Sequence, residues 1–222
     1  MKFDILYEDS ELIVCIKPAG VPTQSKEIRT SDMETLLKTY LRKSSTSKEI
    51  PYLAVIHRLD QPVEGILVFA KTPAAAKNLN IQLTTSGFGK YYRALLSRIP
   101  EKSEDTLKHF LVRDGRTNTS SVCTADTPGA KSAQLHYNIV KTIGEQAVAE
   151  IELDTGRHHQ IRVQMAAIGC PIVGDRKYGA AALDSGRPAS RRDNRRIELY
   201  ACRLTFIHPR TKKQMSFEID RL

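Results

Sequence analysis

Short apolar runs separated by turn residues dominate the pattern along the chain and predict buried strands. These runs lie at 11–17, 52–56, 65–71 and 90–96. The first run is followed by PAGVP, where proline and glycine predict a turn. Alternating apolar and polar residues predict two half-buried strands over 132–140 and 147–155. The segments 196–209 and 214–219 predict a closing hairpin.

Apolar residues at helical spacing predict helices over 31–43 and 159–169. In the first of these, Ser31 and Glu34 have the spacing of a capping box, in which two side chains satisfy backbone N–H groups at the start of a helix. The second ends at Gly169, and glycine is the usual residue just after a helix.

A further helix is predicted between Thr72 and Gly87. Thr72 is a suitable N-cap, Pro73 suits the first helical position, and Gly87 follows the last periodic residue. Strands outnumber helices, and most of them have a partner nearby in the sequence, which favours an α+β fold with a mixed, mostly antiparallel central sheet and flanking helices and loops. Without a repeat or a long linker, residues 1–222 are expected to form a single domain.

Charge narrows the class of partner. The chain has 222 residues, of which 41% are hydrophobic, and its 34 Lys and Arg against 25 Asp and Glu give a formal net charge of +9. A basic excess of this size attracts polyanions, so nucleic acid is the leading partner, with incidental basicity as the alternative. The densest basic cluster lies in the polar tract 184–196, a predicted loop; its arginines are Arg187, Arg191, Arg192, Arg195 and Arg196.

The four cysteines lie far apart without CxxC spacing, which is typical of a reducing compartment. No apolar run reaches the roughly 18 residues of a membrane span, and the first segment carries acids where a signal peptide is apolar. We therefore expect a cytoplasmic protein. The adjacent His158 and His159 would diverge on a helix and have no Cys or acidic partner at ligand spacing, so we expect no metal.

The first candidate site is HRLD, in which His57, Arg58 and Asp60 lie between two predicted strands. A carboxylate at this place serves as a nucleophile or base if it stays ionised, and a neighbouring guanidinium favours the ionised form. The alternative is a salt bridge that closes a turn. Burying such charges without partners is costly, so we expect each of them to have either a partner in the fold or a functional role.

A second candidate site extends from Leu153 to Gly179, where basic and amide side chains gather in a loop that enters a helix. Backbone N–H groups at a helix start favour anions. Surface solvation is the alternative for Arg157, whereas Arg162 is flanked by apolar residues. In a third segment, Tyr91 and Tyr92 must face opposite sides of a strand, so that one can stack on a nucleobase, although a core role is the alternative.

Five segments together resemble one family in order and spacing, from about residue 5 to 219. The segments are ILYEDSELIVCIKPAG, HRLDQPVEGILVFAK, KYYRALL, LDTGRHHQIRVQMAAIGCPIVGDRKYG and LTFIHPRT. They are similar to those of the RluA-type RNA pseudouridine synthases. This resemblance implies the pseudouridine synthase fold and an isomerase that converts selected uridines of RNA without cofactor or metal. We expect structured rRNA or tRNA as the substrate, base flipping of the target uridine, and a monomeric protein.

The resemblance also implies roles for individual residues. Asp60 matches the catalytic aspartate, Tyr92 the tyrosine that packs on the target uracil, and Arg162 the basic partner of the aspartate. Arg58 matches the arginine that helps to displace the target from its stack. Further substrate contacts are implied for His57, Lys90, Arg157, His159, Gln160 and Ile161.

The chain departs from the family pattern at two places. Val63 and Glu64 replace a threonine and a serine of HRLDxxTSG, which adds a carboxylate that repels phosphate unless a cation pairs with it, and Gln164 stands where IRVH has histidine. The chain also begins almost directly on the catalytic segments, without room for a small S4-type domain, so the catalytic domain itself is expected to recognise RNA.

Two other functions are weighed against the enzyme. A catalytically silent RNA-binding or RNA-chaperone protein on the same fold would explain the altered loop. The intact set of Asp60, Tyr92 and Arg162 argues against it. A basic hydrolase unrelated to RNA would need a carboxylate pair or a Ser–His signature, and the sequence offers neither.

Overall fold

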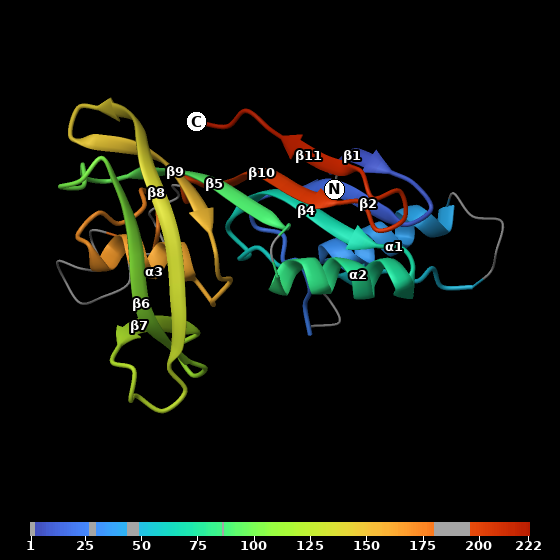
Figure 1. The fold of residues 1–222 in the computed structure, drawn as a ribbon, viewed down its shortest axis with the longest axis horizontal. Helices are drawn as coiled ribbons and strands as arrows, with labels where there is room; N and C mark the ends of the chain where they lie inside the picture. Colours follow the sequence, from blue (N-terminus) through green and yellow to red (C-terminus); the bar gives the residue numbers. More distant parts are fainter. Residues whose placement is uncertain (1–2, 27–29, 44–48, 86, 180–195) are drawn as a thin grey trace. The chain divides into compact units, whose positions relative to one another are not determined.

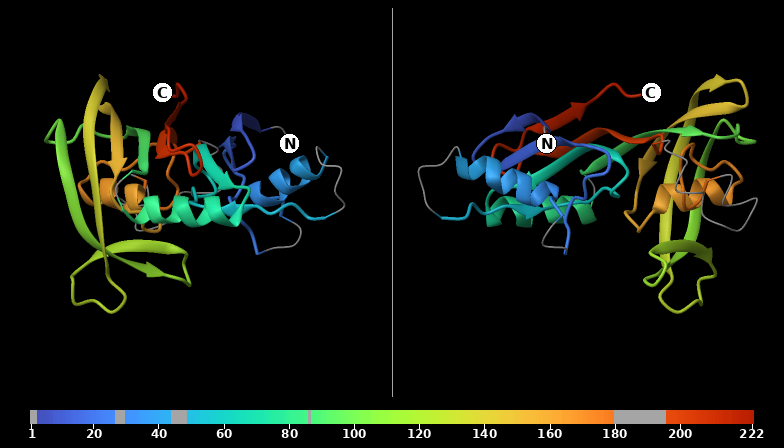
Figure 2. Two further views of the ribbon diagram at one scale, coloured as in Figure 1. Left: turned by 45° about the vertical axis from the view of Figure 1, so that its right-hand side comes forward. Right: turned by 180° about the vertical axis from the view of Figure 1, so that it is seen from behind.

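A computed structural model describes residues 3–26, 30–43, 49–85, 87–179 and 196–222. The chain forms two compact units, each with its own strands and helices (Figures 1 and 2). Unit 1 comprises Met1–Gly89 and Ala201–Asp220, and unit 2 comprises Lys90–Tyr200 and Arg221–Leu222. The expectation of one catalytic domain over 1–222 stays a prediction.

Unit 1 is built on strands in the order β1, β2, β4 and β10, with β3 paired to β4 and β11 paired to β10. The bounds are β1 (Asp4–Glu8), β2 (Leu12–Lys17), β3 (Ala54–Val55), β4 (Glu64–Ala70), β10 (Leu199–Ile207) and β11 (Gln214–Glu218), with α1 (Met33–Lys43) and α2 (Pro73–Thr84). The strands β2 and β4 run antiparallel, from Leu12 opposite Ala70 to Lys17 opposite Gly65. This register sets the end of β2 beside the start of β4.

The core of unit 1 forms because β2 and β4 are apolar on both faces. All residues of β4 after Glu64 are buried, and α2 contributes Ala75, Ala76 and Leu79 to a cluster that also contains Phe206 of β10. The predicted start of α2 is confirmed, since Thr72 Oγ1 accepts the N–H of Ala75 at 3.1 Å. Two buried strands and a packed helix therefore hold the β3–β4 connection in place.

Gly65→Ala is expected to destabilise unit 1 by about 3 kcal/mol or more. Gly65 has a φ of +146°, and a Cβ built on it would lie 2.5 Å from both Cβ and the carbonyl oxygen of Ala201. The matched control is Gly20→Ala, where φ is +84° but nothing lies within 4 Å of the added Cβ. Urea unfolding measures both, and equal losses would contradict the steric explanation.

Unit 2 has an antiparallel sheet in the order β5, β9, β8, β6 and β7. The bounds are β5 (Gly89–Leu96), β6 (Glu104–Asp114), β7 (Thr119–Cys123), β8 (Lys131–Ile143) and β9 (Gln146–Leu153), followed by α3 (Gln160–Ala167). All residues of α3 up to Ala166 are buried. Its polar side chains must therefore find partners inside the protein.

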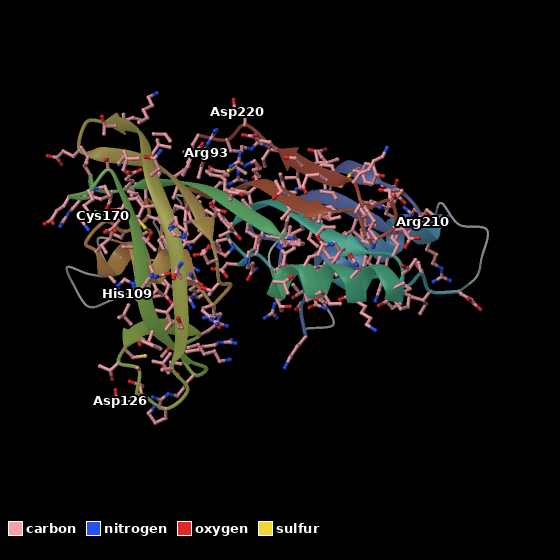
Figure 3. All side chains as sticks on the ribbon, in the orientation of Figure 1. Arg93, His109, Asp126, Cys170, Arg210 and Asp220 are labelled. Carbon is pink, nitrogen blue, oxygen red and sulfur yellow. The ribbon has the colours of Figure 1, made fainter. Side chains whose placement is uncertain are left out.

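Gln164 shows how α3 is joined to this sheet. The side chain has no exposed surface, and its Nε2 donates to the carbonyl oxygen of Leu107 at 3.1 Å. The same nitrogen lies 3.0 Å from Nδ1 of His109, which is labelled in Figure 3. The departure from IRVH at this position is thus accommodated by hydrogen bonds between α3 and β6.

The α+β prediction with mostly antiparallel strands is confirmed, with some differences in detail. The capping box from Ser31 is wrong, because α1 begins at Met33 and Asp32 Oδ1 accepts the N–H of Thr35 at 2.8 Å. The strands β1, β6 and β7 were not predicted. Of the basic tract 184–196, the residues 184–195 lie outside the described part of the chain, and Arg196 is exposed. Within the described part, no helix is long and apolar enough to span a membrane.

Candidate active site

In unit 1, Asp60 lies in the connection between β3 and β4. The carbonyl oxygen of Asp60 accepts the N–H of Val63 at 3.1 Å, which closes a turn. Leu59 and Val63 are buried, Arg58 is exposed, and Asp60 is half-buried. Burial of Leu59 and Val63 therefore anchors the turn on both sides of Asp60, whose side chain remains partly accessible.

Both chain neighbours of Asp60 are fixed to the segment that follows β2. Thr23 Oγ1 donates to the carbonyl oxygen of Leu59 at 3.1 Å and lies 3.2 Å from the N–H of Leu59. The carbonyl oxygen of Gln61 accepts the N–H of Gly20 at 2.8 Å, and Gln61 Nε2 donates back to the carbonyl oxygen of Gly20 at 3.1 Å. These bonds hold the backbone on both sides of Asp60.

Lys17 is a buried cation beneath the Asp60 turn. Its Nζ donates to the carbonyl oxygens of Pro18, Val21 and Gln61 at 3.0, 2.7 and 3.0 Å, and its side chain has no exposed surface. Burial lowers the pKa of Lys17 to about 8, against the raising effect of the Asp60 and Glu64 charges. The charge of Glu64, the residue that departs from the family pattern, therefore interacts with the buried Lys17 ammonium group. Lys17 was not among the residues expected at the site. A lysine at the end of an apolar strand and before PAG was the available signal.

His57 is held by groups of unit 1. Its Nε2 accepts the N–H of Val68 at 3.3 Å, and its ring lies edge-on to Phe88 at 5.4 Å. These contacts fix the ring beside β4. Its expected contact with substrate stays a prediction, as does the role of the exposed Arg58.

In unit 2, β5 carries the two tyrosines and Lys90. Burial alternates along β5, with Tyr92 buried and Tyr91 half-buried, which confirms that they face opposite sides. Lys90 is buried on the Tyr92 side, and a Cβ built on Gly156 would lie 3.6 Å from its Nζ. Burial lowers the pKa of Lys90, while the charge of Asp154 raises it. The amine of Lys90 thus lies against the loop before α3.

Gln160 holds the loop before α3 in place through three hydrogen bonds. Its Oε1 accepts Thr155 Oγ1–H at 2.7 Å and the N–H of Arg157 at 2.9 Å, and its Nε2 donates to the carbonyl oxygen of Gln134 at 3.0 Å. Arg157 in turn donates from Nε to the carbonyl oxygen of Ser132 at 2.8 Å. Gln160 and Ile161 are both buried, so the substrate contacts expected of them remain predictions.

Arg162 forms a buried ion pair that the sequence analysis did not anticipate. Its Nε and Nη2 donate to the two carboxylate oxygens of Asp175 at 2.7 and 2.8 Å. Burial raises the pKa of Asp175, but hydrogen bonding and the charge of Arg162 outweigh it and hold that pKa below its usual value. The guanidinium carbon also lies 5.1 Å from the ring centroid of Tyr178. The expected partnership of Arg162 with Asp60 stays a prediction.

The two histidines do not diverge as predicted. The helix α3 begins at Gln160, and His159 just before it has a φ of 55°, so neither ring is on the helix. The rings stack with centroids 3.7 Å apart. His158 Nδ1 lies 2.9 Å from Ser120 Oγ, and His159 Nδ1 lies 2.8 Å from Tyr178 Oη. In the described residues, no group of three or more His, Cys, Asp or Glu side chains is arranged to hold a metal ion.

The structure thus sorts the expected residues into two sets. His57, Arg58 and Asp60 belong to unit 1, where Lys17 and Thr23 join them. Unit 2 holds the other expected residues, namely Lys90, Tyr92, Arg157, His159, Gln160, Ile161 and Arg162, to which Asp175 and Tyr178 are added. The first set contains the Asp60 carboxylate in a turn held by backbone hydrogen bonds. The second contains Tyr92 on β5, the loop with Arg157, and the Arg162 guanidinium paired with Asp175.

Comparisons with known proteins show which family the chain resembles over most of its length. The family model described as RNA pseudouridylate synthase matches residues 11–167. An uncharacterized RNA pseudouridine synthase, YlyB of Bacillus subtilis, is 30% identical over 98% of this chain and 69% of its own length. The ribosomal large subunit pseudouridine synthase C of Buchnera aphidicola is 34% identical over 95% of this chain and 64% of its own. The chain spans about two thirds of these relatives.

A solved structure supports the fold. Human RNA pseudouridylate synthase domain containing 4 superposes with a TM-score of 0.79 at 22% sequence identity, covering 98% of this chain and 88% of that one.

Proposed function

Since the chain belongs to the RNA pseudouridylate synthase family, whose members are isomerases that act on RNA, we propose that it converts specific uridines of rRNA or tRNA into pseudouridine. The observation that carries this proposal is the Asp60 turn, where a partly accessible carboxylate is held by backbone bonds to both neighbours above a buried cation. The backbone bonds on both sides of Asp60 fix the place from which its carboxylate would act on a substrate.

The proposed reaction conserves all atoms. The bond from the sugar C1′ to N1 of uracil breaks, the base rotates, and a bond from C1′ to C5 forms; C5 loses a proton and N1 gains one. The reaction therefore consumes no co-substrate, and we propose, as the resemblance implies, that it needs no cofactor and no metal. Its demands are an ionised carboxylate at the nucleoside, a surface that retains the detached uracil, and exclusion of water during the rotation.

We assign these tasks as the resemblance implies. Asp60 acts on the nucleoside as the catalytic carboxylate, Tyr92 packs on the uracil, and Arg162 supports the aspartate. A uridine inside folded RNA must be flipped out, and Arg58, exposed beside Asp60, fills the space it leaves. Further RNA contacts are proposed from His57, Lys90, Arg157, His159, Gln160 and Ile161. We place this activity in the cytoplasm, in a monomeric protein.

Deletion and rescue test the proposed function. The gene is deleted, pseudouridines are mapped across cellular RNAs, and the strain is complemented with wild type or Asp60→Ala. We expect one or more sites to disappear, to return with wild type, and to stay absent with the variant. If wild type restores no modification, the enzyme proposal fails; if Asp60→Ala restores it too, the catalytic assignment fails.

Glu64 favours a second candidate, an RNA-binding or RNA-chaperone protein that has lost activity, because it puts a carboxylate where the family pattern has a hydroxyl. Against this candidate, the negative charge of Glu64 interacts favourably with the buried Lys17 ammonium group. Glu64 therefore has a compensating cation, which favours a preserved site. The silent protein predicts RNA binding with no change of modification in the deletion strain.

RNA affinity is expected to fall steeply with salt, because the net charge is +9. If about four phosphates are neutralised, the logarithm of the binding constant should fall with the logarithm of salt concentration at a slope of roughly −3. Fluorescence anisotropy with a labelled RNA stem-loop, at salt concentrations from 50 to 300 mM, measures the slope. A slope near zero would contradict RNA as the partner for both candidates.

A further inference from the structure

Arg162 and Asp175 form a two-point ion pair in the interior of unit 2. The side chains of Arg162 and Asp175 are 5% and 0% exposed, and Nε and Nη2 each face one carboxylate oxygen, at 2.7 and 2.8 Å. A guanidinium bonded through two parallel N–H groups cannot rotate about its own axis without breaking one of them. The carboxylate therefore sets the plane and direction of the guanidinium.

Asp175 is itself held rigidly. Its Oδ1 accepts the N–H groups of Lys177 and Tyr178 at 2.9 and 3.1 Å, and its carbonyl oxygen accepts the N–H of Gly179 at 2.8 Å. A Cβ built on Gly179 would lie 2.1 Å from that carbonyl oxygen, so this tight turn requires glycine. The motif GDRKYG thus builds a turn around one carboxylate.

Tyr178 extends the same arrangement. Its ring centroid lies 5.1 Å from the guanidinium carbon of Arg162, a cation–π distance. Its hydroxyl oxygen accepts the N–H of Ser120 in β7 at 2.7 Å and lies 2.8 Å from His159 Nδ1. The ring is therefore fixed from β7 and from the loop before α3, and it limits tilting of the guanidinium.

We propose that Asp175 and the ring of Tyr178 are positioning residues that orient the Arg162 guanidinium for the isomerisation. This inference rests on the proposed function. Arginine has five N–H donors, and the pair with Asp175 uses two of them, from Nε and Nη2. Because the guanidinium is planar, this pair also fixes the direction of its other N–H groups. Catalysis then depends on a carboxylate that touches neither substrate nor reacting atoms.

The central test replaces Asp175 by Asn. An amide cannot accept one N–H at each of its two terminal atoms, because its nitrogen is a donor, so the two-point pair is broken and the guanidinium loses its fixed orientation. We expect kcat for pseudouridine formation to fall by about 10²-fold while KM for RNA changes by less than about threefold. The matched control is Glu150→Gln, which alters the half-exposed pair in which Arg93 Nε and Nη2 bond Glu150 at 3.0 and 2.9 Å. Its kcat should stay within about twofold of wild type.

A double-mutant comparison separates positioning from general destabilisation. If Asp175 acts through Arg162, Arg162→Met combined with Asp175→Asn should lower kcat no further than Arg162→Met alone. A double variant whose loss of activation free energy equals the sum of the losses in the two single variants would overturn the proposal. So would a folded Asp175→Asn protein with the kcat of wild type.

Tyr178 provides the test if Asp175→Asn does not fold. Tyr178→Leu keeps the ion pair and removes the ring, whereas Tyr178→Phe keeps the ring and removes the hydroxyl. We expect Leu to lower kcat by about fivefold or more relative to Phe. Equal values of kcat would overturn the proposal. An inactive wild-type protein would instead overturn the proposed function, so the two failures are distinguishable.

Discussion

Asp60→Asn is expected to lower kcat for pseudouridine formation by about 10³-fold or more while the protein stays folded. The amide has the shape of the carboxyl group but carries no negative charge. The turn keeps its backbone bonds, which run through Leu59, Gln61 and the backbone of Asp60, so we expect the variant to fold. A single-turnover assay on a target RNA measures the rate, and thermal unfolding measures the fold.

The matched control for this variant is Asp4→Asn, an exposed position on β1 of the same unit. It makes the same change of charge and should leave kcat within about twofold of wild type. RNA affinity should be nearly equal in Asp60→Asn and wild type. A folded Asp60→Asn protein with more than about a tenth of wild-type activity would remove Asp60 from the proposed mechanism.

Features decided by neighbours in sequence were predictable. The opposite orientation of Tyr91 and Tyr92 follows from the two-residue period of a strand, and the start of α2 follows from Thr72 capping a residue three positions later. The same local logic failed at α1, where Asp32 and Ser31 are adjacent candidate caps. Asp32 has a second partner outside the helix, because its Oδ2 accepts the N–H of Ser25 at 2.6 Å. This contact, which the sequence does not reveal, favours Asp32 over Ser31 as the cap.

Features that depend on distant partners were not predictable from the sequence. Gln61 is 44 residues from Lys17, and Asp175 is 13 residues from Arg162, so no periodicity connects them. The strand β6 was missed because residue type does not follow burial there: apolar Phe110 is exposed, whereas polar His109 is half-buried. The resemblance identified Asp60 and Arg162, but only the fold shows what holds each in place.

Lys17→Met is expected to destabilise the protein by about 2–4 kcal/mol and to lower kcat by about 10²-fold. Methionine fills a similar volume but cannot donate to the carbonyl oxygens of Pro18, Val21 and Gln61. Each bond lost from a charged donor costs about 1.5–3 kcal/mol. This is partly offset because the carbonyl oxygens of Pro18 and Gln61 keep the N–H groups of Val21 and Gly20, and because an ammonium group no longer needs to be buried. Gln61 directly follows Asp60, so the loss of its bond to Lys17 is expected to shift the carboxylate that we propose to be catalytic. Lys77→Met, on the exposed side of α2, is the control.

The pH dependence of unfolding tests the same group independently. Burial lowers the pKa of Lys17 in the folded protein from 10.5 to about 8, so between these pH values the unfolded chain binds more protons than the folded one. The free energy of unfolding from this group must then rise with pH across that window, by at most about 1.4 kcal/mol per pH unit. Lys90, whose pKa burial also lowers, contributes to every curve. The part that comes from Lys17 should be present in wild type and Lys77→Met and missing in Lys17→Met, so the difference between wild type and Lys17→Met should grow with pH. Parallel curves for wild type and Lys17→Met between pH 8 and 10.5 would mean that no buried ammonium lies beneath the Asp60 turn.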